Sequence, residues 1–455
     1  MFKTGKHTII FAGIFMILTA CSETGTQNSI SIMEERQISF SAKNHALDNN
    51  DNFSPDDRFL CYDTRGTVFN KNLANCKSIE KIEIATGKET VLWEPESVTG
   101  EEAAPGVAAV SWHPSEEKVI FIQGPLLEEV EARGFYGIRN RTGVEVSANG
   151  KGVVTKVDMR DVSTERATIN GAQRGGTHRH EYARNGKRIG FTYDDFLVQN
   201  FDRTIGYMEP NAAAPQGYTH YFAVLLKPAE IGKSKPGEIE KAYGDSWVGA
   251  DGKMRAFVGK IRAENGVDYQ TDLFVADIPD SVDITTAFSG DATSYPQPPR
   301  GVEIRRLTDC GTVSGIVRGS HDGKQIAYLA EDKSGILQIF VIPSQKSALP
   351  EGSFEKSFQL SEFQSNASDI RWHPSGSSIF AIADGNIAVF SFQNKEKKGK
   401  YLFLTNDTQK REELVVSNDG NTLAYTMLKT GDYPGELRQI FVMDLNWEVI
   451  NDKIK

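Results

Sequence analysis

The sequence predicts an all-β protein, a seven-bladed β-propeller of four-stranded blades that is closed by an N-terminal strand. Three observations lead to this prediction. A tight polar turn followed by a short apolar strand occurs seven times, a Leu-Thr-like stretch leads into several of these repeats, and a stretch of the same form stands before the first turn. Repeats of about 40–45 residues are typical of propellers, in which each unit forms one four-stranded blade.

The seven turns define the repeat. Several contain Asp-Gly or Asn-Gly, which favour tight hairpins because both residues tolerate positive φ. The strands that follow are rich in Ile, Val, Phe and Tyr, as half-buried strands are. The turns occupy residues 54–57, 113–116, 184–187, 250–253, 320–323, 373–376 and 417–420.

The stretch from Arg36 to Phe40 has the lead-in form but precedes the first turn. We expect it to be the outer strand of the seventh blade, so that the ring closes without an open edge. Two smaller propellers, or a sandwich beside a propeller, would need a linker that the sequence lacks. The propeller is predicted over 36–447, with a C-terminal tail at 448–455. Surplus residues at 124–177, 196–248 and 280–302 predict surface loops that shape a binding face.

The N-terminus has the features of a lipoprotein signal. Lys3 and Lys6 precede an apolar run that is too short to span a bilayer and that ends in Leu-Thr-Ala-Cys at 18–21. We therefore expect a removable signal at 1–20, lipidation of Cys21, and a flexible tether over 21–35. A secretory signal with a chance cysteine is the alternative. The lipid would hold the domain at a membrane of the cell envelope, most simply the outer membrane, facing the periplasm or the surface.

Charge and cysteines limit the partners. A net charge of −10 argues against nucleic acid as a ligand, which needs a basic face. The net charge is compatible with an anionic glycan as ligand, because a local arginine cluster can bind anions on an acidic protein. Cys61, Cys76 and Cys310 match no zinc pattern, and in an oxidising envelope Cys61 and Cys76 could form a disulfide.

The histidines can be sorted by their place in the repeat. The first strand of each repeat runs along the central channel and ends at the turn, so a residue five to eight positions before the turn lies at the channel mouth. His178 and His180 occupy such positions. Alternation by two places both side chains on one face of the strand, toward the channel. Three other histidines lie in turns, where we expect turn hydrogen bonding: His113, His321 and His373.

Two imidazoles on one face can chelate a divalent metal or act as acid and base. The alternative is that they bond loops between blades. Arg174 is a candidate carboxylate clamp, because a guanidinium matches a carboxylate in a bidentate manner. His45, before the first inner strand, and Tyr193 are candidate bases.

The lead-in and turn strings resemble the repeat of TolB-like and WD40-like propellers. More narrowly, five strings resemble an uncharacterised propeller family of enterobacteria and Bacteroidota, for which no activity can be transferred. The strings are Asn-His-Ala-Leu at 44–47, Arg-Gly-Gly-Thr-His-Arg-His at 174–180, Phe-Thr-Tyr-Asp-Asp at 191–195, Ala-Tyr-Gly-Asp-Ser-Trp-Val-Gly at 242–249 and Pro-Pro-Arg-Gly-Val at 298–302.

A more distant resemblance is to oligogalacturonate lyase, a seven-bladed propeller with a metal held by histidines at the channel mouth, and to propeller ulvan lyases that use His, Tyr and Arg. It implies a divalent metal (Mn, Zn or Ca) on His178 and His180. The resulting hypothesis is a lyase that cleaves a uronate-containing oligo- or polysaccharide by β-elimination. Arg174 and the metal would neutralise the carboxylate, and His45 or Tyr193 would be the base. The alternative is a non-catalytic TolB-like propeller that binds a glycan or an envelope protein.

Overall fold

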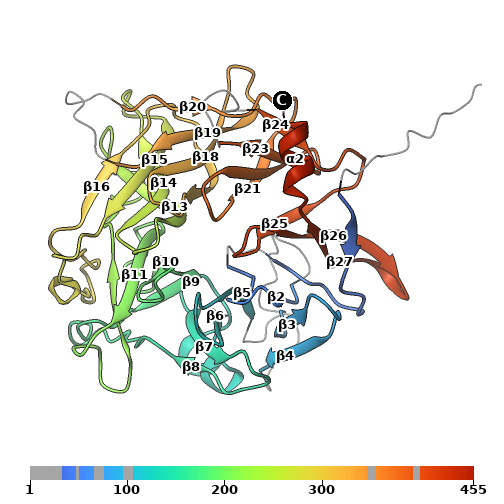
Figure 1. The fold of residues 1–455 in the computed structure, drawn as a ribbon. Helices are drawn as coiled ribbons and strands as arrows, with labels where there is room; N and C mark the ends of the chain where they lie inside the picture. Colours follow the sequence, from blue (N-terminus) through green and yellow to red (C-terminus); the bar gives the residue numbers. More distant parts are fainter. Residues whose placement is uncertain are drawn as a thin grey trace, which may run out of the picture.

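A computed structural model describes residues 33–47, 51–65, 76–95, 106–345, 354–392 and 400–454. It confirms the seven-bladed propeller, with the blades arranged around a common centre (Figure 1). The predicted signal at 1–20, Cys21 and most of the tether lie outside the described residues. No helix within the described ranges is long and apolar enough to cross a membrane.

The blades follow one another in chain order, and each is antiparallel. Blade one contains β2 (Phe59–Asp63), β3 (Ile79–Glu83) and β4 (Glu89–Trp93). Blade two contains β5 (Val107–Trp112), β6 (Lys118–Gln123), β7 (Thr142–Ser147) and β8 (Thr155–Lys156). Blade three contains β9 (Gly175–Tyr182), β10 (Ile189–Asp195), β11 (Thr204–Pro210) and β12 (His220–Val224). Blades four and five contain β13 (Ile239–Val248), β14 (Met254–Arg262), β15 (Tyr269–Asp277) and β16 (Glu303–Arg306); β17 (Ser314–Gly319), β18 (Gln325–Glu331), β19 (Leu337–Pro343) and β20 (Phe358–Gln359).

Blade six contains β21 (Ala367–Trp372), β22 (Ser378–Ala383), β23 (Asn386–Ser391) and β24 (Tyr401–Phe403). Blade seven contains β25 (Glu412–Val416), β26 (Thr422–Gly431), β27 (Tyr433–Asp444) and β1 (Glu35–Gln37). The inner segment of blade one is marked by two bridges to β2, Ala46 with Asp63 and Phe53 with Leu60. Short helical segments are η2 (Leu127–Glu129), α1 (Val130–Arg133), η3 (Ile284–Thr286) and α2 (Trp447–Lys453).

The ring closes as the lead-in pattern predicted. Strand β1 pairs antiparallel with β27, with Arg36 opposite Val442. The strand begins at Glu35, and Met33 is already packed in the apolar cluster between blades six and seven. Structured residues therefore extend into the stretch predicted as tether. The predicted C-terminal tail also differs, because α2 forms there and Ile450 is buried in the same cluster.

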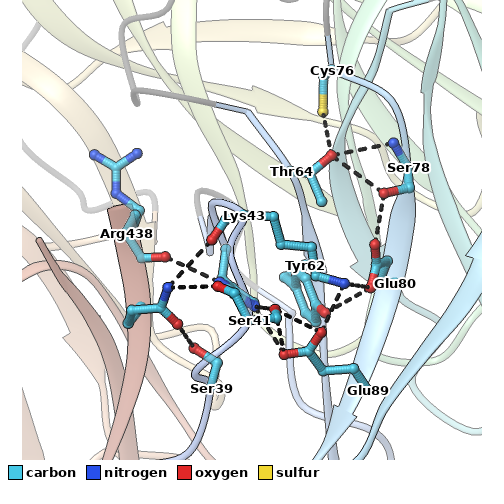
Figure 2. Close-up of polar contacts among 12 residues, drawn as sticks. Ser39, Ser41, Lys43, Tyr62, Thr64, Cys76, Ser78, Glu80, Glu89 and Arg438 are labelled. Carbon is cyan, nitrogen blue, oxygen red and sulfur yellow. Dashed lines mark hydrogen bonds and ion pairs between the residues drawn. The ribbon is translucent and has the colours of Figure 1, made fainter. Parts of the chain in front are cut away.

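Polar contacts of residues 39–45 strengthen this closure by linking the last blade to the first (Figure 2). The Ser39 hydroxyl donates to Gln439 Oε1 of β27 over 2.7 Å. On the other side, Lys43 Nζ lies 2.5 Å from Glu80 of β3 and 2.7 Å from Glu89 of β4. The segment is thus fixed to both blades that meet at the closure.

Apolar clusters fill the interfaces between neighbouring blades. Between blades one and two, for example, Cys61 and Leu92 pack with Trp112 and Phe121. Both faces of each sheet are covered in this arrangement, because every blade has a neighbour on each side, so strands such as β10 and β22 are buried along their whole length. The inner strands of the blades surround the centre of the ring, and they carry the polar residues described below.

The cysteines do not form the disulfide that the sequence left open. Cys61 and Cys76 are buried free thiols, and Cys310 is exposed. Cys61 Sγ lies 3.9 Å from the carbonyl oxygen of Asp51, whereas Cys76 Sγ lies 3.6 Å from Asp63 Oδ1. The thiols thus contact different groups, and burial raises the pKa of each well above its usual value.

Candidate functional site

A β-bulge in β9 overturns the alternation that was expected to bring His178 and His180 to one face. His178 pairs with Thr192 and Glu181 with Gly190, so Arg179 and His180 together stand opposite a single residue of β10. Arg179 has a φ of 58°, in the left-handed region. Such a bulge re-aims the side chains that follow it. The two imidazoles consequently lie in different surroundings.

His180 packs between blades two and three. A Cβ added at Gly143 of β7 would lie 2.5 Å from His180 Nε2, so the imidazole occupies the space that this glycine leaves free. On the other side, the ring centroid lies 5.8 Å from that of Phe191. The side chain is fully buried, and this burial lowers the pKa of His180 to about 3. His180 therefore acts as a neutral packing residue.

His178 is half-buried and lies among arginines. Burial, with the charges of Arg141, Arg203, Arg65 and Arg179, holds the pKa of His178 well below its usual value. The imidazole is neutral at physiological pH, and its surroundings are positively charged. A divalent cation would be repelled there, and an anion would be attracted.

The predicted carboxylate clamp, Arg174, is already occupied within the protein. Its Nε donates to Asp195 Oδ2 over 2.8 Å, Nη2 donates to the carbonyl of Ser294 over 2.8 Å, and Nη1 donates to the carbonyl of Asp291. The side chain has no exposed surface. Arg174 thus fixes the loop at 291–294 against blade three, and a ligand would have to break a buried ion pair to reach it.

The two predicted bases are buried and hydrogen-bonded within the protein. The Tyr193 hydroxyl donates to Asp195 Oδ2 over 2.9 Å, and burial raises the pKa of Tyr193 well above its usual range. His45 belongs to the closure, where its Nδ1 lies 3.1 Å from the carbonyl oxygen of Arg438 and its Nε2 lies 3.1 Å from Glu89 Oε1. The residues predicted as one catalytic site therefore lie in four separate environments. The turn positions of His113 and His373 are confirmed, since Nδ1 of each accepts a backbone N–H of its own turn.

The proposed metal ligands do not fit a divalent cation. His180 is enclosed between blades, and His178 has four guanidiniums around it. Across the described part of the chain, no group of three or more His, Cys, Asp or Glu side chains could hold a metal ion. The charged side chains around His178 are guanidiniums, a group that pairs with carboxylates and other anions.

A polar cavity lies in the central channel, on the turn side of these histidines. Its volume is about 50 Å³, and inner strands of six blades line it. Its charged residues are Asp51, Glu181, Arg184, Arg318 and Arg371. Pro374 and His321, which are linked by a 3.0 Å hydrogen bond, belong to its turn-side wall. The cavity is large enough for a few water molecules or for one carboxylate, but not for a sugar ring.

Three arginines at this level have guanidinium nitrogens without a partner among the described residues: Nη1 and Nη2 of Arg318, Nε of Arg371, and Nε and Nη2 of Arg179. Where the remaining nitrogens make contacts, they donate only to main-chain carbonyls. Arg318 and Arg371 donate to the carbonyl of Ile370, and Arg179 donates to that of Asp245. Arg318 is 3% exposed and Arg371 is 6% exposed. Buried donors of this kind require water or an anion, because a charge without compensation is costly in the interior.

The arginines also repel one another. Burial and then the charges of Arg371 and Arg179 lower the pKa of Arg318. Burial lowers the pKa of Arg371 to about 10, which leaves its guanidinium charged at neutral pH. Lowered pKa values of two neighbouring cations indicate an uncompensated positive field, in which a bound anion would be stabilised.

Four carboxylates partly balance this field. Burial raises the pKa of Asp51 to about 6, although Arg184, Arg318 and Arg371 all favour its charged form. Glu181 is bonded to Arg255 of blade four, whose Nη1 lies 3.1 Å away. Arg255 is in turn paired with Asp245, and Asp369 lies near Arg371. Five guanidiniums thus face four carboxylates, of which Asp51 is only half charged near pH 6.

The positions of these arginines in the sequence also indicate a ligand site in the channel, and sorting the histidines by position did not reveal it. Arg318 and Arg371 occupy the same place in their repeats, two residues before the first residue of the turn. Arg179 lies between the two histidines that were singled out. A charged residue that recurs on a strand lining the channel is a stronger indication of a ligand site than a histidine pair within one blade, because different blades converge on the channel.

Comparison with known proteins gives the family. Residues 106–220 match the family described as protein of unknown function (DUF3748). Solved structures with a similar fold include oligogalacturonate lyase from Vibrio parahaemolyticus, at 10% identity, a TM-score of 0.48, and coverage of 93% of this chain and 96% of the other. A putative TolB from Agrobacterium tumefaciens has 15% identity, a TM-score of 0.39, and coverage of 81% and 98%.

The most informative relative is the uncharacterized protein YidR of Escherichia coli (strain K12). It is 30% identical over an alignment of 422 residues that covers 86% of this chain and 94% of the relative. This similarity extends well beyond the DUF3748 segment and covers most of the propeller. The chain belongs to the YidR family.

Proposed function

We propose that this protein is a binding propeller that takes a carboxylate-bearing ligand into its central channel. The observation that carries the proposal is the set of guanidinium nitrogens on Arg179, Arg318 and Arg371 that have no partner within the described ranges. A guanidinium binds a carboxylate through two parallel hydrogen bonds, and such bonds are strongest where water is excluded.

The ligand class that we favour is an acidic oligosaccharide, with a uronate carboxylate inserted between the arginines. The cavity of about 50 Å³ admits the carboxylate, while the sugar ring would remain outside it. An acidic peptide terminus of an envelope protein offers the same group. A panel of both ligand types separates them, and a lipid anchor on Cys21 would place the propeller at the envelope, where either is found.

Cleavage by β-elimination is the second candidate, and one observation favours it. Asp51, with a pKa of about 6, lies beside the arginines that would neutralise the carboxylate. A carboxylate with this pKa can accept a proton near neutral pH. Binding ranks first, because a sugar ring must come close to Asp51 for elimination and the cavity is too small for one. The residues first assigned to catalysis, Arg174, His45 and Tyr193, would then only maintain the structure.

Calorimetric titration of the mature domain with glucuronate and with glucose tests the proposal. Glucuronate should bind and glucose should not, because only the acid carries the group that the arginines need. The double variant Arg318→Gln, Arg371→Gln should weaken glucuronate binding at least tenfold, since hydrogen bonds to charged groups contribute about 1.5–3 kcal/mol each.

The matched control is Arg300→Gln, an exposed arginine outside the channel, which should bind like the unaltered protein. Equal binding of glucuronate by all three proteins would refute the proposal, as would equal binding of acid and neutral sugar. The β-elimination candidate is tested on the same samples by the absorbance of unsaturated uronates after incubation with acidic glycans. Binding without such absorbance would leave a binding protein.

A further inference from the structure

A groove on blade six is separate from the channel, because none of the described residues that line it also lines the channel cavity. Its volume is about 350 Å³, several times that of the channel cavity, so it is large enough for a sugar ring. Its walls are the loop between β20 and β21, the turn between β22 and β23, and the outer strand β24. Ala383 pairs with Ala367, the first residue of β21, so the groove lies at the end of the blade where the inner strand begins.

Three aromatic side chains line this groove, those of Phe363, Tyr401 and Phe403. The ring of Tyr401 lies at 78° to that of Phe363 and at 88° to that of Phe403, with centroids 5.3 Å and 5.6 Å away. Phe390 of β23 is fully buried and lies 5.1 Å from the same ring. These contacts fix the Tyr401 ring, although it is 39% exposed. An accessible aromatic ring that is held in place offers a platform for the apolar face of a sugar ring.

The hairpin turn between β22 and β23 is also held in place. Asp384 has a φ of 47° and Gly385 a φ of 79°, the two positive values of a type I′ turn. The Asn386 side chain bonds to the main chain of Asp407 through both its oxygen and its nitrogen, each over 3.0 Å. Arg411 Nη1 donates to the carbonyl of Gly385 over 3.2 Å. The turn is thus tied to the segment that follows β24, and the groove is preorganised.

The polar side chains at the groove suit hydroxyl groups better than an anion. Glu362 and Asp384 supply carboxylates, and Lys410 Nζ lies 2.5 Å from Asp384 Oδ1. Among the lining residues that the structure describes, there is neither Lys nor Arg. A uronate would meet like charge there, whereas a sugar hydroxyl can donate to a carboxylate and accept from an amide. Amides are available on the exposed side chains of Gln364 and Asn406.

We propose that this groove binds a neutral oligosaccharide, with one sugar ring stacked on Tyr401 and its hydroxyls bonded to the carboxylates and amides of the groove. The inference does not rest on carboxylate binding in the channel, because the two sites differ in residues and in charge. A single hexose makes one stacking contact, so its Kd should lie above about 1 mM. An oligosaccharide whose neighbouring rings reach further polar groups should bind more tightly, and glucose remains a suitable control for the channel.

Calorimetric titration of the mature protein with neutral hexasaccharides of glucose, mannose and xylose tests this inference. At least one should bind, and Tyr401→Ala should weaken that binding by about tenfold, whereas Tyr401→Phe, which keeps the ring, should preserve it. Asn406→Ala changes an exposed side chain and should weaken binding by about two- to tenfold, the effect of one lost hydrogen bond. The matched control is Phe288→Ala, since Phe288 is also 39% exposed but lies outside the groove.

The outcomes separate the groove from the channel. Unchanged binding in both Tyr401→Ala and Asn406→Ala would overturn the inference, as would a failure of all three hexasaccharides to bind. Binding that is lost in the Arg318→Gln, Arg371→Gln variant and kept in Tyr401→Ala would place the neutral sugar in the channel and also overturn it. A hexasaccharide of galacturonate should not displace the neutral one, and displacement would contradict the charge argument. Circular dichroism of the variants confirms that each is folded.

Discussion

Replacing His45 by alanine should destabilise the ring and leave ligand binding intact. The imidazole is fully buried, bonds to Glu89 and to the carbonyl of Arg438, and lies 4.8 Å from the ring of Tyr62. Truncation leaves a cavity and removes one charge-assisted hydrogen bond. The carbonyl oxygen of Arg438 still accepts the backbone N–H of residue 45, so it keeps a hydrogen bond in the variant. The cost should be about 3 kcal/mol.

For a folded domain of roughly 400 residues the entropy of unfolding near the midpoint is about 0.8 kcal/mol per kelvin. The loss should therefore lower Tm by about 3–4 °C in a calorimetric scan. The matched control is Phe40→Ala, in the same segment, because Phe40 is 69% exposed and its removal should change stability by less than about 0.5 kcal/mol. If His45→Ala melts like the unaltered protein but fails to bind or cleave an acidic glycan, the closure role is wrong and the catalytic role is favoured.

Three further predictions follow from the chemistry of single residues. Cys21→Ser should leave a precursor that is neither lipidated nor cleaved after the Leu-Thr-Ala run, and recovery of processed, membrane-bound protein would contradict the lipoprotein signal. His180→Ala should lower Tm more than His178→Ala does, because only His180 packs against Gly143; equal shifts in thermal denaturation would contradict the two surroundings. Monocarboxylate binding should weaken as pH rises through about 6, because Asp51 becomes charged and competes for the arginines. This pH dependence should disappear in titrations of Asp51→Asn, and a dependence that persists in the variant would exclude Asp51 as its source.

The fold was predictable because its determinants are local and repeated. Each turn and the strand after it carry their own conformational preferences, and seven copies reinforce one another. Even the closure was visible, since the segment at 36–40 has the form of a lead-in strand without a turn before it. The C-terminal helix was missed because it is short and because packing of Ile450 against two blades, rather than helix propensity, fixes it.

The site was predicted poorly for a reason that is also physical. Alternation along β9 holds only in a regular strand, and the bulge at Arg179 breaks it, so His180 packs between blades. The arginines of the channel come from separate blades, and only the closed ring brings them together. Arg174 was read as a free clamp because the sequence does not show that Asp195 and the loop at 291–294 occupy its donors.

A crystal structure of the mature domain soaked with glucuronate would test the central claim most directly. The account predicts a carboxylate in the central channel, with its two oxygens within hydrogen-bonding distance of the guanidiniums of Arg318 and Arg371 and the sugar ring outside the cavity. A ligand bound elsewhere on the propeller would contradict it. So would a channel in which ordered water satisfies all three arginines while the ligand remains unbound at saturating concentration.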